Sequence, residues 1–212
     1  YVPVVHVGRY LGKSLDYLES CPNLAAKQQI AVGGLVPNLL RTPKASCYSA
    51  ILNDLIAVRE RFPNKRLHLF GVGGTATIHL AALLGFDSAD SSGWRNRAAR
   101  GIIQLPGSGE RIVADLGGWR GRPLSKEELV KLRKCPCPAC ESCGCDGLRA
   151  NGLDGFKCRA THNLWVLLDE VRWVSERINN RNYKKYFRRR LDNTVYLPLI
   201  EKVISKSSEK KH

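Results

Sequence analysis

Three closely spaced cysteines and a later histidine form the clearest chemical motif of the sequence. Cys135, Cys137 and Cys140 lie in the segment CPCPAC, and His162 follows further along the chain. Thiolates at this spacing converge on one ion without long loops, and a distant imidazole completes the tetrahedral coordination of structural zinc. We therefore expect one Zn2+ ion, whose binding energy would stabilise the fold. The competing interpretation is a set of buried or reactive free cysteines.

Asp90 is the second candidate for chemistry, because it ends a predicted strand. An apolar run, Leu67–Phe70, stops at a glycine-rich turn, and a short helical pattern follows before the run Phe86–Asp90. A strand–helix–strand unit of this kind predicts a parallel sheet, and active sites of such folds collect at the carboxyl ends of the strands. Asp90 is thus a candidate catalytic residue. The simpler interpretation is a helix cap or a structural acceptor.

Basic and aromatic residues follow Asp90 directly and recur near the end of the chain. The segment WRNRAAR carries Arg95, Arg97 and Arg100 beside a tryptophan, a combination typical of phosphate contacts and base stacking. The segment RNYKKYFRRR places Lys184 and Lys185 among aromatic residues. We expect its aromatic side chains to pack inward and its basic face to meet a sugar–phosphate backbone. The plain alternative is a solvated basic surface.

The elements that must position these residues alternate between strands and helices. Runs rich in β-branched residues predict further strands at 2–7 and 30–32. The spacing of apolar residues predicts a long amphipathic helix within 42–62. In the central unit, Thr75 is the expected cap of the short helix and Gly85 its expected end. The chain thus begins with four strands joined by helices, as in a parallel α/β fold.

The second half of the chain predicts smaller elements. Residues 102–113 form an expected β-hairpin around PGSG, and Ser125 with Glu128 forms a capping box for a short helix. The strongest helical pattern runs from His162 to Asn180, with one apolar face made of Leu164, Leu167, Leu168, Val171, Val174 and Ile178. We expect three parts: residues 1–118 with four βα units and the hairpin, 119–162 as a zinc-binding subdomain, and 163–212 as C-terminal helices with a basic tail.

The stretch HLFGVGG followed by GFDSADSS resembles the last two barrel strands of the tRNA-guanine transglycosylase family. Its members exchange a guanine in nucleic acid for a 7-deazaguanine. The upstream GGLVP, the serine after Asp90, and the cysteine motif with HNL extend the resemblance over nearly the whole chain. The archaeosine-type members and the DNA-modifying DpdA type are the most similar. The resemblance implies an α/β fold: the C-terminal half of a TIM barrel with an inserted zinc-binding subdomain and C-terminal helices.

The resemblance also implies roles for individual residues. Asp90 matches the nucleophile, which would form a covalent sugar–enzyme intermediate and give net retention. Phe70 matches a residue that stacks against the base, and the family's GGL, where backbone groups approach the base edge, matches Gly33, Gly34 and Leu35.

His6 falls beside a family glutamine that contacts the base. The substitution leaves two interpretations open, a base contact and a satisfied core histidine. Asp87 matches a second family aspartate, to which we assign a structural role. The family's general acid/base aspartate comes from an early strand and has no counterpart in this chain.

The composition narrows the class of partner. The 212-residue chain carries a formal net charge of +15, which predicts attraction to polyanions, with nucleic acid favoured over an anionic membrane.

The chain has no methionine and starts at Tyr1, so we expect a piece of a longer protein. No apolar run approaches the roughly 20 residues of a spanning helix, and no signal peptide is visible. The clustered cysteines then favour metal binding in the reducing cytoplasm over a disulfide framework.

We interpret the sequence as part of a zinc-containing base-exchange enzyme whose partners are nucleic acid and a 7-deazaguanine base. A short hairpin and the lack of an RNA-binding module downstream favour DNA over tRNA. One alternative is a non-catalytic subunit of the same fold, which the presence of Asp90 opposes. Another is a zinc-dependent nucleic-acid-binding module, which the GGL and FDSAD matches oppose. A homodimer and an accessory subunit both stay open.

Overall fold

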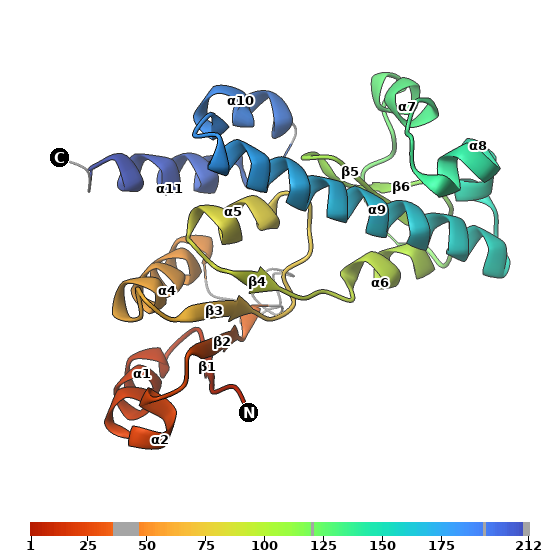
Figure 1. Ribbon diagram of the computed structural model, residues 1–212. Coiled ribbons are helices and arrows are strands. Elements are labelled where there is room, and N and C mark those ends of the chain that lie inside the picture. Colours follow the sequence, from red (N-terminus) through yellow and green to blue (C-terminus); the bar gives the residue numbers. More distant parts are fainter. Residues whose placement is uncertain (36–46, 120, 193, 210–212) are drawn as a thin grey trace. The chain divides into compact units, whose positions relative to one another are not determined.

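The computed structural model describes residues 1–35, 47–119, 121–192 and 194–209 (Figure 1). The chain divides into two compact units. The first contains Tyr1–Val72, His79–Ser91 and the segment from Pro198 onward. The second contains Gly73–Ile78 and Ser92–Leu197.

The first unit is built on a parallel sheet. Within the described residues the sheet has four strands in the order β1-β2-β3-β4, and every neighbouring pair is parallel. The strands are β1 (Val4–His6), β2 (Gln29–Gly33), β3 (Arg66–Leu69) and β4 (Ser88–Ala89). Its helices are α1 (Leu11–Ser20), α2 (Pro22–Ala25), α4 (Tyr48–Arg61), most of α5 (Thr77–Leu83) and most of α11 (Leu197–Glu209). The predicted α/β class and parallel sheet are confirmed.

Apolar residues of the strands form the core of this unit. Val5, Ile30 and Leu67 are buried and pack with leucines of α1 and α4. This burial explains the β-branched and leucine-rich runs seen in the sequence. The predicted helix within 42–62 corresponds to α4, and its expected beginning at 42–46 lies outside the described residues.

The turns around α5 match one expectation and contradict another. Gly85 follows the helix with φ +75°, and its amide donates to Ala82 O, so the predicted glycine end is confirmed. Thr75 does not cap the helix. Its buried hydroxyl donates to Leu105 O at 3.0 Å, because the hairpin of the second unit offers a buried carbonyl there.

The second unit packs helices around a hairpin and one long helix. The hairpin is β5 (Ile102–Leu105) with β6 (Gly109–Ile112), as predicted. The capping box is also confirmed, because Ser125 Oγ accepts from Glu128 N and Glu128 Oε2 accepts from Ser125 N. The helices are α6 (Gly93–Ala99), α7 (Lys126–Arg133), α8 (Pro138–Arg149), α9 (Gly152–Asn179) and α10 (Tyr183–Arg190).

Helix α9 begins ten residues earlier than the apolar pattern predicts, at Gly152 rather than His162. Its packed face is partly polar: Arg159, Asn163 and Glu170 are buried together with apolar residues. The helix therefore packs through a different face from the one that the apolar pattern predicts. Leu164, Leu168 and Val171 of the predicted face are exposed. Among the described helices, none combines the length and the apolar composition that crossing a membrane requires.

Candidate active site and metal centre

The candidate active-site residues of the first unit lie where neighbouring parallel strands end. His6 ends β1 and Gly33 ends β2, while Phe70 and Asp90 directly follow β3 and β4. Backbone hydrogen bonds continue past the strands, from Phe70 N to Val32 O at 2.9 Å and from Asp90 N to Leu69 O at 3.2 Å. Because parallel strands end at one edge, the fold brings these predicted residues together along it.

Asp90 has an open carboxylate at this edge, with 57% of its side chain exposed. Its Oδ1 accepts the Gly71 N–H at 3.0 Å and lies 3.4 Å from His68 Nε2. The glycine-rich turn after β3 thus supplies a backbone donor to the carboxylate. One oxygen is held, and the residue keeps access to a ligand.

Gly33 and Gly34 leave room that a side chain would fill. A Cβ on Gly33 would lie 3.0 Å from His6 Nε2, and Gly34 has φ +78°, which strains any residue with a side chain. Leu35 is 2% exposed and belongs to the core, so only its backbone can face a ligand. Phe70 is 42% exposed, as a stacking residue must be.

His6 lies on the exposed face of β1. Its side chain is exposed, and the strand register pairs it with Gly33. The strand presents Val4 and His6 on one face and buries Val5 on the other. Both interpretations of His6, a base contact and a core histidine, stay predictions.

Asp87 has the surroundings of a structural residue. Its Oδ2 accepts the Leu67 N–H at 2.8 Å and pairs with Arg59 at 3.2 Å. These contacts join β3 to the segment before β4 and to α4, as expected of a residue with a structural role.

The three candidate arginines of the second unit differ in their contacts. Arg97 Nε donates to Glu110 Oε1 at 2.5 Å. The Arg100 guanidinium lies 4.1 Å from the ring centre of Trp119, whose side chain is half exposed. The side chain of Arg95 is exposed and makes no hydrogen bond or ion pair within the described part of the chain, while its backbone N–H donates to Ser92 O. Arg95 and Arg100 are therefore available to phosphate, whereas Arg97 is already paired.

Two buried residues of α9, not predicted from the sequence, hold α6 in place. Asn163 Nδ2 donates to Trp94 O and Ile102 O, and its Oδ1 accepts from Gln104 N at 2.7 Å. Arg159 Nε donates to Ala98 O at 2.8 Å. The HNL segment drew attention to this part of the helix only through the family resemblance, and the sequence assigned no role to Asn163 or Arg159. Polar residues on a helix are otherwise expected at the surface.

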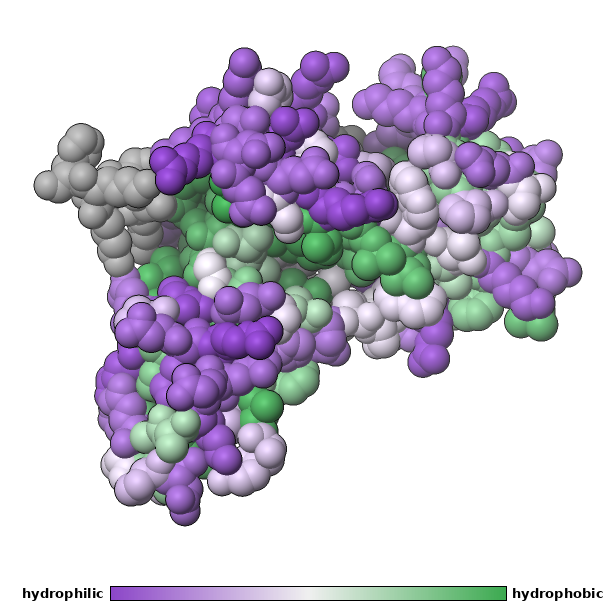
Figure 2. Space-filling model, viewed as in Figure 1, coloured by the Kyte–Doolittle hydropathy of each residue, from purple (hydrophilic) through white to green (hydrophobic). Residues whose placement is uncertain are grey.

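Helix α10 separates aromatic from basic residues as predicted. Tyr183 and Phe187 are buried, whereas Lys184 and Lys185 are exposed. Figure 2 shows a mostly hydrophilic surface over this helix. Arg190, at its last turn, points back to α9 and donates to Glu170 Oε1 at 2.9 Å.

The predicted metal ligands converge. The ligand atoms of Cys135, Cys137, Cys140 and His162 all lie within 4.8 Å of one another. His162 Nδ1 is 3.8, 3.4 and 3.5 Å from the three sulfurs in that order. Its Nε2 is 3.0 Å from Gln104 O, which fixes the proton on Nε2 and leaves the Nδ1 lone pair facing the sulfurs. The cluster is able to bind a metal ion.

The titratable groups of the cluster shift one another's pKa values. Hydrogen bonds from Cys135 and Cys140 lower the pKa of the Cys137 thiol, while Cys135 and Cys137 raise the pKa of Cys140. Burial lowers the pKa of His162, but hydrogen bonds to Cys135 and Cys137 outweigh it and raise the pKa to about 9. Thiolates this close repel one another, and a divalent cation would relieve that repulsion.

The remaining cysteines of this region do not join the cluster. Cys143 and Cys158 form a disulfide that joins α8 to α9. Spacing along the chain could not reveal this pairing, because α9 begins before the predicted position and carries Cys158. Cys145 is free and half-buried.

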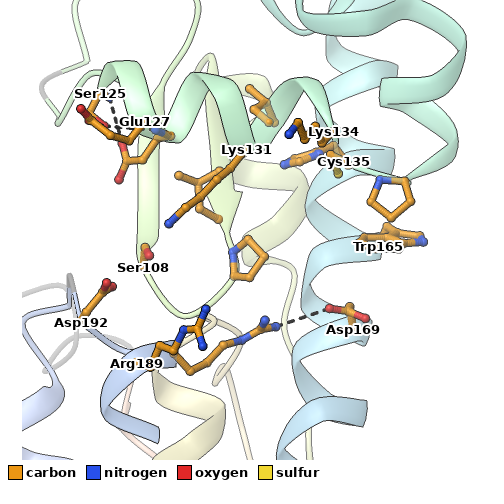
Figure 3. Close-up of a pocket in the computed structure, with 17 residues that line it drawn as sticks. Ser108, Ser125, Glu127, Lys131, Lys134, Cys135, Trp165, Asp169, Arg189 and Asp192 are labelled. Carbon is orange, nitrogen blue, oxygen red and sulfur yellow. Dashed lines mark hydrogen bonds and ion pairs between the residues drawn. The ribbon is translucent and has the colours of Figure 1, made fainter. Parts of the chain in front are cut away.

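A pocket of about 780 Å³ lies beside the cluster, with Cys135 and His162 in its wall. Figure 3 shows Lys131 of α7 and Arg189 of α10 in its lining, with Trp165 at one side. Its lining contains as many carboxylates as basic side chains, and Asp169 is paired with Arg190. The pocket therefore favours neither an anion nor a cation.

The fold and these sites define a class of protein. Residues 9–195 match the family described as queuine tRNA-ribosyltransferase. Since the match spans most of the chain, the protein belongs to this family.

Curated relatives carry a narrower name. A tRNA-guanine(15) transglycosylase of Pyrococcus abyssi is 25% identical over 192 residues, which is 84% of this chain and 30% of the relative. Proteins of the same name are similar in Methanocaldococcus jannaschii, with 26% identity over 70% of this chain and 21% of the relative, and in Methanopyrus kandleri, with 30% identity over 64% and 26%. The chain thus spans less than a third of the length of these relatives.

Proposed function

We propose that the full-length protein exchanges a guanine base in tRNA for a 7-deazaguanine, with Asp90 as the nucleophile. The proposal rests on the surroundings of the Asp90 carboxylate at the carboxyl edge of the sheet. One carboxylate oxygen is held by a backbone amide, and the side chain is largely exposed beside Phe70 and the glycine pair. Such a carboxylate can approach the anomeric carbon of a nucleoside that has left the base stack.

The proposed reaction balances in two displacements. An Asp90 oxygen bonds to C1′ while the C1′–N9 bond of guanine breaks, and guanine leaves with the electron pair and takes up a proton from water or an acid of the full-length enzyme. The incoming base then gives up a proton, bonds to C1′ and releases the carboxylate. Two inversions give net retention. A nearby anion stabilises the oxocarbenium-like charge in both steps.

The relatives favour tRNA over the DNA substrate that the sequence suggested. Each is named for exchange of guanine in tRNA, and together with the family match they support the tRNA alternative. DNA is kept as the second substrate in the assay described below. The exposed Arg95 and Arg100, with Lys184 and Lys185, would contact the sugar–phosphate backbone.

We propose Zn2+ as the ion of the cysteine–histidine cluster. Tetrahedral coordination with Zn–S near 2.3 Å and Zn–N near 2.05 Å requires S···N separations of about 3.6 Å. The observed Nδ1···S distances range from 3.4 to 3.8 Å. Four protein ligands leave no open position, so the ion would stabilise the second unit and take no part in the exchange.

The parallel sheet would form half of a (β/α)8 barrel in the full-length protein. Its exposed Val4 and His6, and the longer relatives, support this proposal. The division into residues 1–118, 119–162 and 163–212 stays a prediction.

Asp90→Asn in the full-length protein tests the function. The amide keeps the size but removes the anion, so nucleic-acid binding should persist while base exchange falls by at least about a thousandfold. The assay follows labelled guanine or 7-deazaguanine into tRNA and duplex DNA in parallel, with a denaturing gel for the covalent adduct.

Asp16→Asn is the matched control, because Asp16 is an exposed carboxylate of the same unit on α1. It should exchange bases at the wild-type rate. Near-normal exchange by Asp90→Asn on either substrate would show that another residue is the nucleophile.

A further inference from the structure

His68 connects two residues of the next strand. The register between β3 and β4 pairs His68 with Ser88, and Asp90 follows β4 directly. His68 Nδ1 lies 2.9 Å from Ser88 Oγ, and Nε2 lies 3.4 Å from Asp90 Oδ1. The imidazole therefore stands between a hydroxyl and the candidate nucleophile, one contact at each ring nitrogen.

The Ser88 hydroxyl can set which nitrogen of His68 carries the proton. If the Ser88 O–H donates to Nδ1, the neutral imidazole keeps its proton on Nε2. That N–H then faces Asp90 Oδ1. The ring of Phe70 packs edge-on against His68, with ring centres 4.9 Å apart, and limits its rotation. With 18% of its side chain exposed, His68 is more enclosed than the carboxylate it faces.

The two carboxylate oxygens of Asp90 have different surroundings. Oδ1 faces both the Gly71 amide and His68 Nε2. Within the described part of the chain, no hydrogen bond or ion pair involves Oδ2. The Gly71 hydrogen bond and the His68 contact restrain Oδ1 and leave Oδ2 open to a ligand. The distance of 3.4 Å between His68 Nε2 and Asp90 Oδ1 is long for a hydrogen bond, as is common before substrate binds. A closer approach of the two side chains would complete this hydrogen bond.

We propose that His68, oriented by Ser88, is the positioning residue of the nucleophile and directs Oδ2 of Asp90 toward C1′ of the target nucleoside. This inference rests on the proposed function. During attack the Oδ2–C1′ bond forms and the C1′–N9 bond breaks, with guanine leaving with the electron pair and gaining a proton from water. Oδ1 becomes the ester carbonyl and keeps its two donors. When the second base displaces the ester, the same donors receive the returning negative charge.

The test compares three variants of the full-length protein with tRNA as the substrate. His68→Leu removes both ring contacts, and His68→Gln keeps an N–H donor of similar reach. Ser88→Ala removes the group that sets the tautomer. We expect His68→Leu to lower kcat about ten- to a hundredfold, since small errors in the position of reacting groups cost that much. KM for tRNA and the unfolding temperature should stay near wild type. His68→Gln should recover most of the lost rate, and Ser88→Ala should fall between the two.

Unchanged kcat in His68→Leu would overturn the inference, as would a His68→Gln variant no more active than His68→Leu. If His68→Leu fails to fold, His68→Gln and Ser88→Ala decide, because wild-type kcat in Ser88→Ala contradicts an oriented imidazole. Asp90→Asn measured alongside separates the two proposals. An active Asp90→Asn overturns the proposed function, whereas an inactive Asp90→Asn with unaffected His68 variants overturns only the role of His68.

Discussion

Two carboxylates three residues apart, Asp87 and Asp90, have opposite surroundings. Asp87 accepts a backbone N–H of β3 and pairs with Arg59, while Asp90 is anchored through one oxygen and largely exposed. The paired residue supports the sheet, and the exposed one can meet a substrate. This contrast distinguishes a structural carboxylate, Asp87, from the proposed nucleophile, Asp90.

Asp87→Ala should destabilise the first unit by about 1–3 kcal/mol, because the half-buried Leu67 N–H loses its acceptor. Asp90→Ala should change the unfolding free energy little, since its contacts are exposed. Denaturant unfolding of both variants measures the difference. Equal destabilisation would show that Asp90 is also a structural residue.

A buried ion pair makes the stability of the second unit depend on pH. Burial raises the pKa of Glu128, but hydrogen bonds from Arg111 and from Ser125 N outweigh it and lower the pKa. The carboxylate therefore stabilises the fold above its unfolded pKa, near 4.3, and this contribution is lost as pH falls through the lower folded pKa.

Glu128→Gln should lower stability by about 3 kcal/mol at pH 7, since it leaves the buried Arg111 unpaired. The difference between wild type and variant should shrink below about pH 4. Unfolding temperatures from pH 7 to pH 3 measure it, and metal loss at low pH affects both proteins alike. A difference that stays constant over this range would contradict the assignment.

Among the helices and strands, the sequence predicted those elements that a local residue pattern determines. The strands, the hairpin and the capping box follow from apolar runs, turn residues and Ser125 with Glu128. The cysteine–histidine cluster, which is able to bind a metal ion, follows from the spacing of its residues. The first ten residues of α9 were missed, because GLDGFKCRAT lacks an apolar period. The burial of Arg159 and Asn163 depends on carbonyls of distant segments, which no local pattern contains.

The metal cluster joins α7, α8 and α9, so its loss should affect the whole second unit. We expect one zinc ion per chain by elemental analysis. Cys137→Ser should lower the unfolding temperature strongly, because the binding energy of a structural ion is folding energy. A strong chelator should reproduce the effect in the wild-type protein.

Cys145→Ser is the matched control, since Cys145 is a free cysteine of α8 outside the cluster. It should keep both the metal and the unfolding temperature. Protein without stoichiometric metal, in which Cys135, Cys137 and Cys140 all react freely with a thiol reagent, would overturn the metal site.

Charge acts at the scale of the whole molecule. A net charge of +15 attracts any polyanion, and the attraction weakens as salt screens it. Overall charge therefore cannot distinguish specific contacts from general attraction. The surroundings of individual arginines can, because a guanidinium already paired with a carboxylate releases few counterions when nucleic acid binds.

The salt dependence of tRNA binding should separate the three arginines of α6 and its C-terminal end. Each phosphate contact contributes about 0.7 to 0.9 to the slope of log K against log salt. Arg95→Ala and Arg100→Ala should each reduce the slope by about that amount, because both side chains are exposed. Arg97→Ala should change it little, since Arg97 is paired with Glu110. Affinities measured over a series of salt concentrations test this.

An equal decrease of the slope for all three variants would show that the Arg97–Glu110 pair opens on binding. Unchanged slopes for Arg95→Ala and Arg100→Ala would place the nucleic acid elsewhere.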